Sequence, residues 1–153
     1  LCLLFASHIH AVEPQQKQLL SPEETLVLLE EIKAYAIVFG EGDREVHTFI
    51  DPYCPVSQRH LTFIFEDRAR TFKRNNYYFY LYEIKRRNSK EMIQTILSAE
   101  SRKQMLKAVM VDDDIVFLEE NSDVDDEIRK IENAAQQIGV YKRPYIIIDG
   151  KVQ

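Results

Sequence analysis

The chain has 153 residues, of which 45% are hydrophobic and 29% charged, a balance that is ordinary for one folded domain. With 4 Gly, 5 Pro and 2 Cys, the composition excludes a fibrous chain and a disulfide-rich scaffold. The 20 basic and 25 acidic residues give a formal net charge of −5, so nucleic-acid binding has no electrostatic support.

The first eleven residues are similar to the apolar part of a secretory signal peptide. They are mostly apolar from Leu1 onward, and the small residue Ala11 stands where cleavage is expected. We expect residues 1–11 to be a signal-peptide remnant and the protein to be exported; the alternative is an ordinary apolar N-terminal strand. Cleavage would remove Cys2 and leave Cys54 as the single cysteine in an oxidising compartment.

A helix is predicted soon after this segment. Ser21 is a helix cap, Pro22 suits the first helical position, and Glu24 completes a capping box. Apolar residues then recur with helical spacing as far as Ala36, and glycines end the segment. We interpret residues 12–44 as an N-terminal helix and linker, followed by the main domain over residues 45–153.

The next elements form a predicted β-α-β unit. Residues 45–51 have the pattern of a strand, 55–74 that of one helix, and 76–82 that of a strand with aromatic residues on both faces. Such a unit implies two parallel strands in one sheet.

The rest of the chain predicts three helices and a hairpin. Helices are expected after Ser89, after Ser101 and over 124–138, the last ended by Gly139. The acidic stretch 112–127, which has nine acids and no base, is expected to be a solvated loop leading into the last helix. A strand at 145–148 and the Asp-Gly turn after it indicate a hairpin. Since the sequence stops just after this turn, we expect the C-terminal end of the domain to be truncated. The order of elements predicts an α/β fold with a mixed sheet flanked by helices.

Cys54 is the residue with the clearest chemical potential. It lies between a predicted strand and a helix that Pro55 begins, where the helix dipole and free backbone amides favour a thiolate. The alternative is a small buried hydrophobic residue, a common fate of a lone cysteine.

The residues around Cys54 resemble the active-site segment of the thioredoxin superfamily. Phe49 to Ser57 is similar to the strand, Asp-Pro-x-Cys-Pro-x-Cys motif and helix of the periplasmic disulfide isomerases DsbC and DsbG. Residues 134–151 resemble the same family's helix, Gly-Val turn, cis-proline, strand and Asp-Gly hairpin, and residues 36–42 resemble the linker before its domain. The resemblance implies a thioredoxin-like fold with a helical insertion, and a periplasmic location.

The resemblance also assigns roles to individual residues. Cys54 would be the catalytic nucleophile, and Pro144 would be the cis-proline that faces it and positions substrate, unless its peptide bond is an ordinary trans turn. Arg143, where the family usually has Thr, would place a cation near the thiolate and favour anionic substrates, or it is a solvated turn residue. The remaining active-site-loop and substrate-binding candidates are Asp51, Pro52, Tyr53, Pro55 and Val56.

Ser57 stands where this family has its second active-site cysteine. A hydroxyl cannot resolve a mixed disulfide by internal attack, so dithiol cycling is not expected. A single thiolate can still attack a substrate disulfide, and Ser57 could stabilise it by donating a hydrogen bond. An engineered Cys→Ser substitution is the alternative explanation of this residue.

These observations lead to two hypotheses of function. In the first, the protein is an exported, isomerase-like thiol-disulfide interchange protein that acts on protein disulfides, with Cys54 as its nucleophile and a reducing thiol as a possible partner. In the second, it is a redox-inactive interaction or chaperone module of the bacterial envelope, with contacts carried by the acidic segment 112–127 and the basic segment 68–90. Neither requires a cofactor, and the lack of a Cys/His cluster gives a metal site no support. We expect His47 and His60 to be surface or structural residues.

Overall fold

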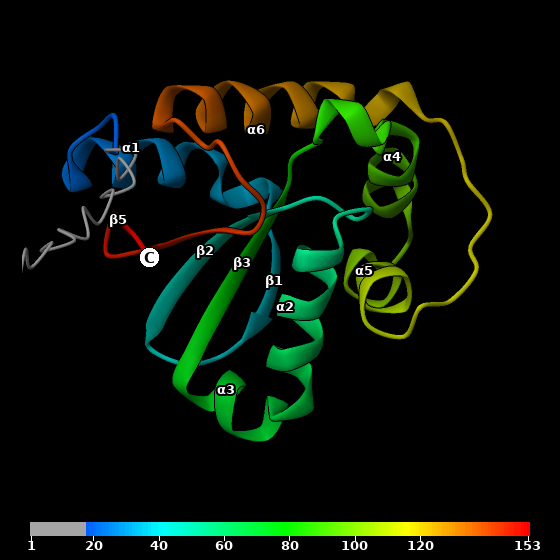
Figure 1. Cartoon of the computed structure of the whole chain (residues 1–153), viewed down its shortest axis with the longest axis horizontal. Coiled ribbons are helices and arrows are strands. Elements are labelled where there is room, and N and C mark those ends of the chain that lie inside the picture. The colour runs from blue at the N-terminus through cyan, green and yellow to red at the C-terminus, as the bar shows by residue number, and fades with distance from the viewer. Residues whose placement is uncertain (1–17) are drawn as a thin grey trace, which may run out of the picture.

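The computed structural model describes residues 18–153, so the expected signal-peptide remnant and Cys2 lie outside the described residues. A five-stranded sheet forms the centre of the molecule, with helices on both of its faces (Figure 1). The strands are β1 (Ile37–Gly40), β2 (Arg44–Ile50), β3 (Asn75–Leu81), β4 (Tyr145–Ile148) and β5 (Lys151–Val152). The α-helices are α1 (Pro22–Ile32), α2 (Pro55–Glu66), α3 (Arg68–Arg74), α4 (Lys90–Ser98), α5 (Arg102–Met110) and α6 (Asp125–Ile138). Short 3-10 helices are η1 (Lys33–Tyr35), η2 (Lys85–Arg87) and η3 (Ser122–Val124).

The strands lie in the order β1-β3-β2-β4-β5. Strands β2 and β3 are parallel, whereas β1 pairs with β3, and β4 pairs with β2 and β5, in antiparallel fashion. The predicted parallel pair and closing hairpin are therefore confirmed, and the sheet is mixed as expected. This order places the end of β2 between residues that follow β3 and residues that precede β4.

Alternation along the two central strands divides the core into two layers. On β3, Phe79 and Leu81 face a cluster with side chains of α2, α4 and α5, while Tyr78 and Tyr80 face a cluster with α1 and α6. Both faces of β3 are thus covered, as its aromatic pattern predicted. Figure 1 shows α1 and α6 running side by side over one face of the sheet.

The N-terminal part of the domain differs from the prediction in one element. We interpreted residues 36–42 as a linker, but residues 37–40 form the edge strand β1, with Ile37 opposite Phe79. The segment is too short for periodicity to reveal a strand, and its pairing partner lies some 40 residues away in the sequence. By contrast, the capping box predicted at Ser21 and Glu24 is present, and α1 begins at Pro22.

The helix predicted over 55–74 is broken at Asp67 into α2 and α3. The hydroxyl of Thr71 donates to the carbonyl oxygen of Ile64, across the break. The resulting bend brings the rings of Phe65 and Phe72 onto Phe39 of β1, with ring centroids 5.0 and 6.0 Å away. The packing of Phe65 from α2 and Phe72 from α3 on the same ring of Phe39 favours the break between the two helices.

The C-terminal half follows the prediction closely. Helices α4, α5 and α6 form where expected, and Gly139 ends α6 in the left-handed conformation with φ of 88°. The residues between α5 and η3 form an exposed connection that extends from the body (yellow in Figure 1), as expected for a solvated acidic loop.

Candidate functional site

Cys54 lies at the junction of β2 and α2. It is the residue before the first turn of α2, and Pro55 occupies the first helical position. The Cys54 N–H donates to the carbonyl oxygen of Asp51 at 3.0 Å, and the Cys54 carbonyl oxygen accepts from the Gln58 N–H at 3.0 Å. The sequence therefore fixes a tight turn followed by a helix start, and the thiol stands at the positive end of the helix dipole.

The segment before β4 lies against the sulfur. Cys54 Sγ is 3.6 Å from the carbonyl oxygen of Arg143, and the Arg143–Pro144 peptide bond is cis. Two segments that are 89 residues apart in the sequence thus meet at one point, with a thiol facing a backbone carbonyl.

Cys54 is a free thiol with little exposed surface. Only 4% of the residue is exposed, yet it lines an open groove of about 640 Å³. We call this hollow the cysteine groove. Its other walls are the segment 82–87 after β3, the segment 141–143 before β4, and Glu132 and Gln136 of α6.

Asp51 holds the loop that carries the cysteine. Its carboxylate is fully buried: one oxygen accepts from the Tyr53 N–H at 2.7 Å, and the other accepts from the Ile84 N–H at 2.5 Å and the Ser89 hydroxyl at 2.7 Å. We expected Ser89 to cap α4, but its hydroxyl makes no capping bond and donates to Asp51 instead. Asp51 therefore ties the cysteine loop to the chain between β3 and α4 and is not exposed to substrate.

Ser57 is also fully buried, in the first turn of α2. Its hydroxyl oxygen accepts from the Asp51 N–H at 3.4 Å. Within residues 18–153, no hydrogen bond joins Ser57 to Cys54, so the expected donation to the thiolate is absent from this arrangement. The sequence motif placed Ser57 near the cysteine, but the orientation of its hydroxyl depends on the buried backbone of β2.

The other candidates from the loop divide into anchored and exposed residues. The Pro52 carbonyl oxygen accepts from the Gln58 side chain at 2.8 Å, and the Tyr53 carbonyl oxygen accepts from Arg87 at 3.1 Å. Pro55 and Val56 are exposed at the start of α2, and Val56 is 48% exposed at the edge of the cysteine groove. Val56 can therefore meet a ligand, whereas Pro52 shapes the loop from inside.

Arg143 contacts the sulfur through its backbone and not through its side chain. Its guanidinium lies 3.7 Å from the ring centroid of Tyr82 and donates to the carbonyl oxygens of Tyr82 and Glu83 at 3.0 and 2.9 Å. Burial lowers the pKa of Arg143 from its ordinary value. The interpretation as a solvated turn residue is therefore wrong: this side chain closes the groove between the ends of β3 and β4.

Sequence reasoning missed three residues that build the site: Tyr82, Arg87 and Ser89. A usable signal was present, because the carboxyl ends of adjacent parallel strands lie at the same edge of a sheet. Since β2 and β3 were predicted to be parallel, the residues after β3 should have been placed beside Cys54.

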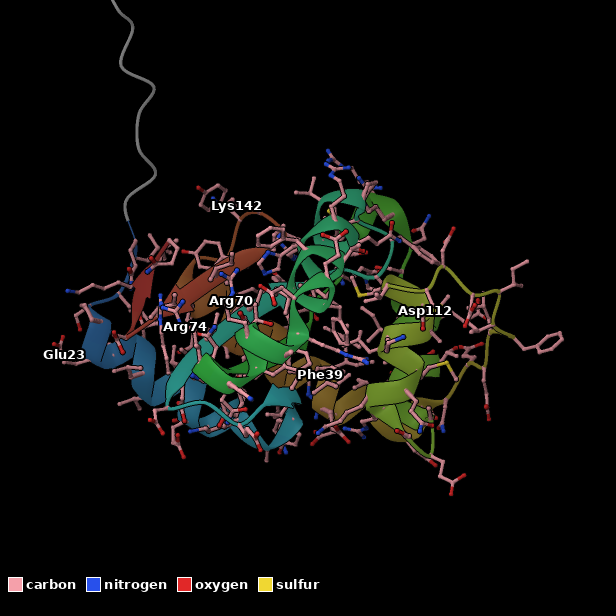
Figure 2. The ribbon with its side chains drawn as sticks, turned by 90° about the horizontal axis from the view of Figure 1, so that it is seen from below. Glu23, Phe39, Arg70, Arg74, Asp112 and Lys142 are labelled. Carbon is pink, nitrogen blue, oxygen red and sulfur yellow. The ribbon has the colours of Figure 1, made fainter. Side chains whose placement is uncertain are left out.

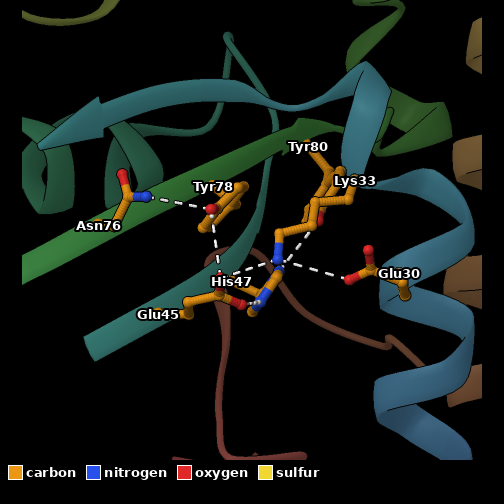
Figure 3. Close-up of polar contacts among 7 residues, drawn as sticks. All are labelled: Glu30, Lys33, Glu45, His47, Asn76, Tyr78 and Tyr80. Carbon is orange, nitrogen blue, oxygen red and sulfur yellow. Dashed lines mark hydrogen bonds and ion pairs between the residues drawn. The ribbon is translucent and has the colours of Figure 1, made fainter. Parts of the chain in front are cut away.

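A second polar cluster lies toward the opposite end of β2 (Figure 3). His47 is 3% exposed, with Nδ1 2.9 Å from the Tyr80 hydroxyl and Nε2 3.3 Å from Glu45. A carboxylate can only accept, so Nε2 carries the proton and Nδ1 accepts from Tyr80. Glu45 also accepts from Tyr78 and from Lys33, whose ammonium is 2.8 Å away. We call these five residues the His47 network; His47 is structural, in line with one of the two roles expected for it.

The described residues give no support to metal chemistry or to a membrane span. Within 18–153, no group of three or more His, Cys, Asp or Glu side chains is arranged to hold a metal ion. In the same range, no helix is both long enough and apolar enough to cross a membrane.

Comparison with known proteins extends the fold assignment. No protein-family model matches the chain, and neither does any curated protein. Among solved structures, the fold is similar to the catalytic domain of Proteus mirabilis ScsC, with a TM-score of 0.70 and 14% identity over 85% of this chain and 88% of that one. It is also similar to a putative protein-disulfide isomerase from Pseudomonas syringae (TM-score 0.64, 20% identity, 79% and 90% covered). Helicobacter pylori DsbG is a third similar structure (TM-score 0.56, 20% identity, 82% and 61% covered).

The thioredoxin-like fold predicted from the sequence is therefore confirmed. At these identities the likeness defines the fold, and the chemistry has to be argued from the cysteine and its surroundings.

Proposed function

We propose that this protein is an exported thiol-disulfide interchange protein of the isomerase type, with Cys54 as its only nucleophile. The single observation that carries the proposal is the position of the Cys54 sulfur. It lies at a helix start, 3.6 Å from the carbonyl oxygen of Arg143, which precedes a cis-proline, and beside an open groove. The names of the structural neighbours, a disulfide isomerase and DsbG among them, support the same chemistry.

The reaction is an exchange without net oxidation. The Cys54 thiolate attacks one sulfur of a substrate disulfide; the substrate S–S bond breaks, a Cys54–substrate disulfide forms, and the other substrate sulfur leaves as a thiolate. That thiolate, or another cysteine of the same substrate, then attacks the mixed disulfide and releases Cys54. Ser57 cannot take this second role, so release depends on a thiol from outside the chain.

Each residue of the site has a defined part in this scheme. Asp51 fixes the turn that presents the sulfur, and the backbone around Pro144 offers a polar edge to an extended substrate segment. Pro55 begins α2 directly after Cys54, so the sulfur lies at the N-terminal end of this helix. Export supplies a compartment in which substrate disulfides persist.

A mixed-disulfide trap tests the proposal. The protein is incubated with a scrambled, disulfide-rich client, acid-quenched and analysed without reductant. We expect a covalent adduct that is absent in Cys54→Ala. Ser57→Cys is the matched variant: it restores a resolving thiol, so we expect its adduct to be short-lived and its yield to fall.

The competing function is a redox-inactive interaction module, which is favoured by the low exposure of Cys54 and by the acidic connection after α5. Ile115 and Phe117 are fully solvent-exposed there, at 102% and 98%. If wild-type protein forms no adduct under mildly oxidising conditions, the interchange proposal fails and this alternative takes its place.

A further inference from the structure

The cysteine groove is unusually rich in positive charge for a protein with a net charge of −5. Its walls include two acidic residues, Glu83 and Glu132, and five basic ones. The basic residues are Lys85, Arg86, Arg87, Lys142 and Arg143. The groove therefore has a formal surplus of three positive charges around the thiol.

This positive charge is only weakly compensated by the protein itself. Within the described part of the chain, Lys85 is the only one of the five that forms ion pairs, at 3.1 Å from Glu83 and 3.3 Å from Glu132. The Lys85 ammonium therefore forms an ion pair with each of the two acidic residues of the groove. The other four basic residues have no carboxylate within 4.0 Å among residues 18–153.

Two of these four are held in place by neutral groups. Arg87 donates to the Tyr53 carbonyl oxygen, and Arg143 donates to the carbonyl oxygens of Tyr82 and Glu83. Backbone carbonyls orient a guanidinium but do not cancel its charge. These residues therefore give the groove a fixed positive floor next to Cys54.

The other two are exposed and face solvent from opposite walls. Arg86 belongs to η2, on the side of β3, and Lys142 precedes β4, on the side of β4; Figure 2 shows Lys142 projecting from its loop at the surface. Because β2 lies between β3 and β4, the sulfur at the end of β2 lies between these two walls. A ligand that meets both basic residues would span the groove that Cys54 also lines.

We infer that the cysteine groove selects substrate proteins in which acidic residues flank the reacting cysteine in an extended segment. This inference rests on the proposed function and names its substrate class. A segment with an acid on each side of its cysteine would place one acid toward Arg86 and the other toward Lys142 while its sulfur meets Cys54. Uncompensated charge of one sign in a groove raises the rate of association with the opposite charge, by tenfold or more at low salt.

The test uses three peptides, each with one cysteine activated as a mixed disulfide with neutral 2-thiopyridine. The cysteine is flanked on both sides by Asp, Asn or Lys, and thiopyridone release reports attack by Cys54. We expect the Asp peptide to react about tenfold faster than the Asn peptide at ~0.01 M salt, and the Lys peptide to be slowest. At ~1 M salt, where the Debye length falls from roughly 30 Å to roughly 3 Å, the three rates should converge.

The double variant Arg86→Glu/Lys142→Glu should lower the ratio of the Asp to the Lys rate below that of the wild type, by tenfold or more. The matched control is Lys73→Glu/Arg74→Glu, which makes the same change of charge on α3, at the far end of α2 from Cys54 (Figures 1 and 2). This control should keep the wild-type ratio. Equal wild-type rates for the Asp and Asn peptides, or an unchanged ratio in the groove variant, would overturn the inference.

Two further measurements separate this inference from the proposed function. Neutral 2,2′-dipyridyl disulfide tests whether Cys54 attacks any disulfide: if it reacts but the peptides show no preference, only the inference fails, and if it does not react, the proposed function fails. Oxidised glutathione tests the small anionic alternative. A rate above that of the Asp peptide, lost in the groove variant, would make a small thiol the occupant and overturn the inference.

Discussion

The two ends of strand β2 show how similar polar residues serve different purposes. Toward its start, the His47 network is closed: Glu45 accepts from Lys33, Tyr78 and His47, and His47 in turn accepts from Tyr80. Beyond its end, the guanidinium groups of Arg87 and Arg143 donate to backbone carbonyl oxygens and form no ion pair among residues 18–153.

This difference separates charged groups that stabilise the fold from charged groups that can bind a ligand. A charged group that is satisfied by an opposite charge within the chain contributes to the fold, and replacing it mainly changes stability. A charged group that is oriented by the chain but not neutralised remains available to a ligand. By this criterion the His47 network is structural and the cysteine groove is the candidate binding site.

The largest expected effect on stability lies between these two regions, at Asp51. Replacing Asp51 by Ala removes the acceptor of three donors, the buried Ser89 hydroxyl and the partly buried N–H groups of Tyr53 and Ile84. Each orphaned donor costs on the order of 1–3 kcal/mol, so we expect a loss of at least about 3 kcal/mol in the free energy of unfolding, measured by urea denaturation.

Asp43→Ala is the control, since Asp43 is exposed in the turn between β1 and β2. We expect it to change stability by no more than about 0.5 kcal/mol. If Asp51→Ala costs as little as this control, Asp51 does not hold the cysteine loop.

A smaller effect should distinguish a network tyrosine from a groove tyrosine. Tyr80→Phe removes the hydroxyl that donates to buried His47 Nδ1, so we expect a loss of about 1–2 kcal/mol. Tyr141→Phe, at a residue that is 51% exposed beside the groove, should change stability by less than about 0.5 kcal/mol. Similar losses in thermal or urea unfolding of the two variants would erase the distinction between a closed and an open region.

The smallest effect concerns pH. Burial lowers the pKa of His47, although its bond to Glu45 acts in the opposite direction, and burial lowers the pKa of His60. The unfolded chain, with histidine pKa values of about 6.5, then binds protons more readily than the folded one. Stability is therefore fully present above about pH 6.5 and is lost as the pH falls through the lowered pKa values.

Replacing the histidines separately locates this pH dependence. His47→Gln and His60→Gln should each flatten the plot of unfolding free energy against pH between about 7 and 5, since each removes one group that is neutral when folded. A plot for His47→Gln with the same slope as the wild type would show that the network does not sense pH.

Much of the site followed from local sequence patterns. Pro55 after a strand marked the start of α2, so Cys54 could be placed at a helix N-terminus from the sequence. The Asp-Gly turn and the Gly139 stop likewise fixed the hairpin and the end of α6. These features depend on neighbours within a few residues, which is the range over which backbone preferences act.

The roles of individual polar side chains could not be predicted in this way. Ser89 has the sequence context of a helix cap, yet its hydroxyl donates to Asp51, 38 residues away. Arg143 was expected to place a cation near the sulfur or to be a solvated turn residue. Only the structure shows that its guanidinium lies on Tyr82, 61 residues away in the sequence, in the wall of the cysteine groove. Each of these side chains forms hydrogen bonds with a group that folding brings close to it. Because that group is distant in the sequence, local sequence patterns do not predict it.

The sequence by itself determined the order of helices and strands and the presence of one candidate nucleophile at a helix start, because these depend on periodicity, capping and turn residues. The thioredoxin-like fold followed from the resemblance of two sequence segments, 49–57 and 134–151, to a known family. Only the tertiary structure decided that the basic residues after β3 and before β4 gather around that nucleophile. The physical reason is the strand order: it places β3 and β4 on either side of β2, and so brings segments more than 50 residues apart to the two walls of one groove.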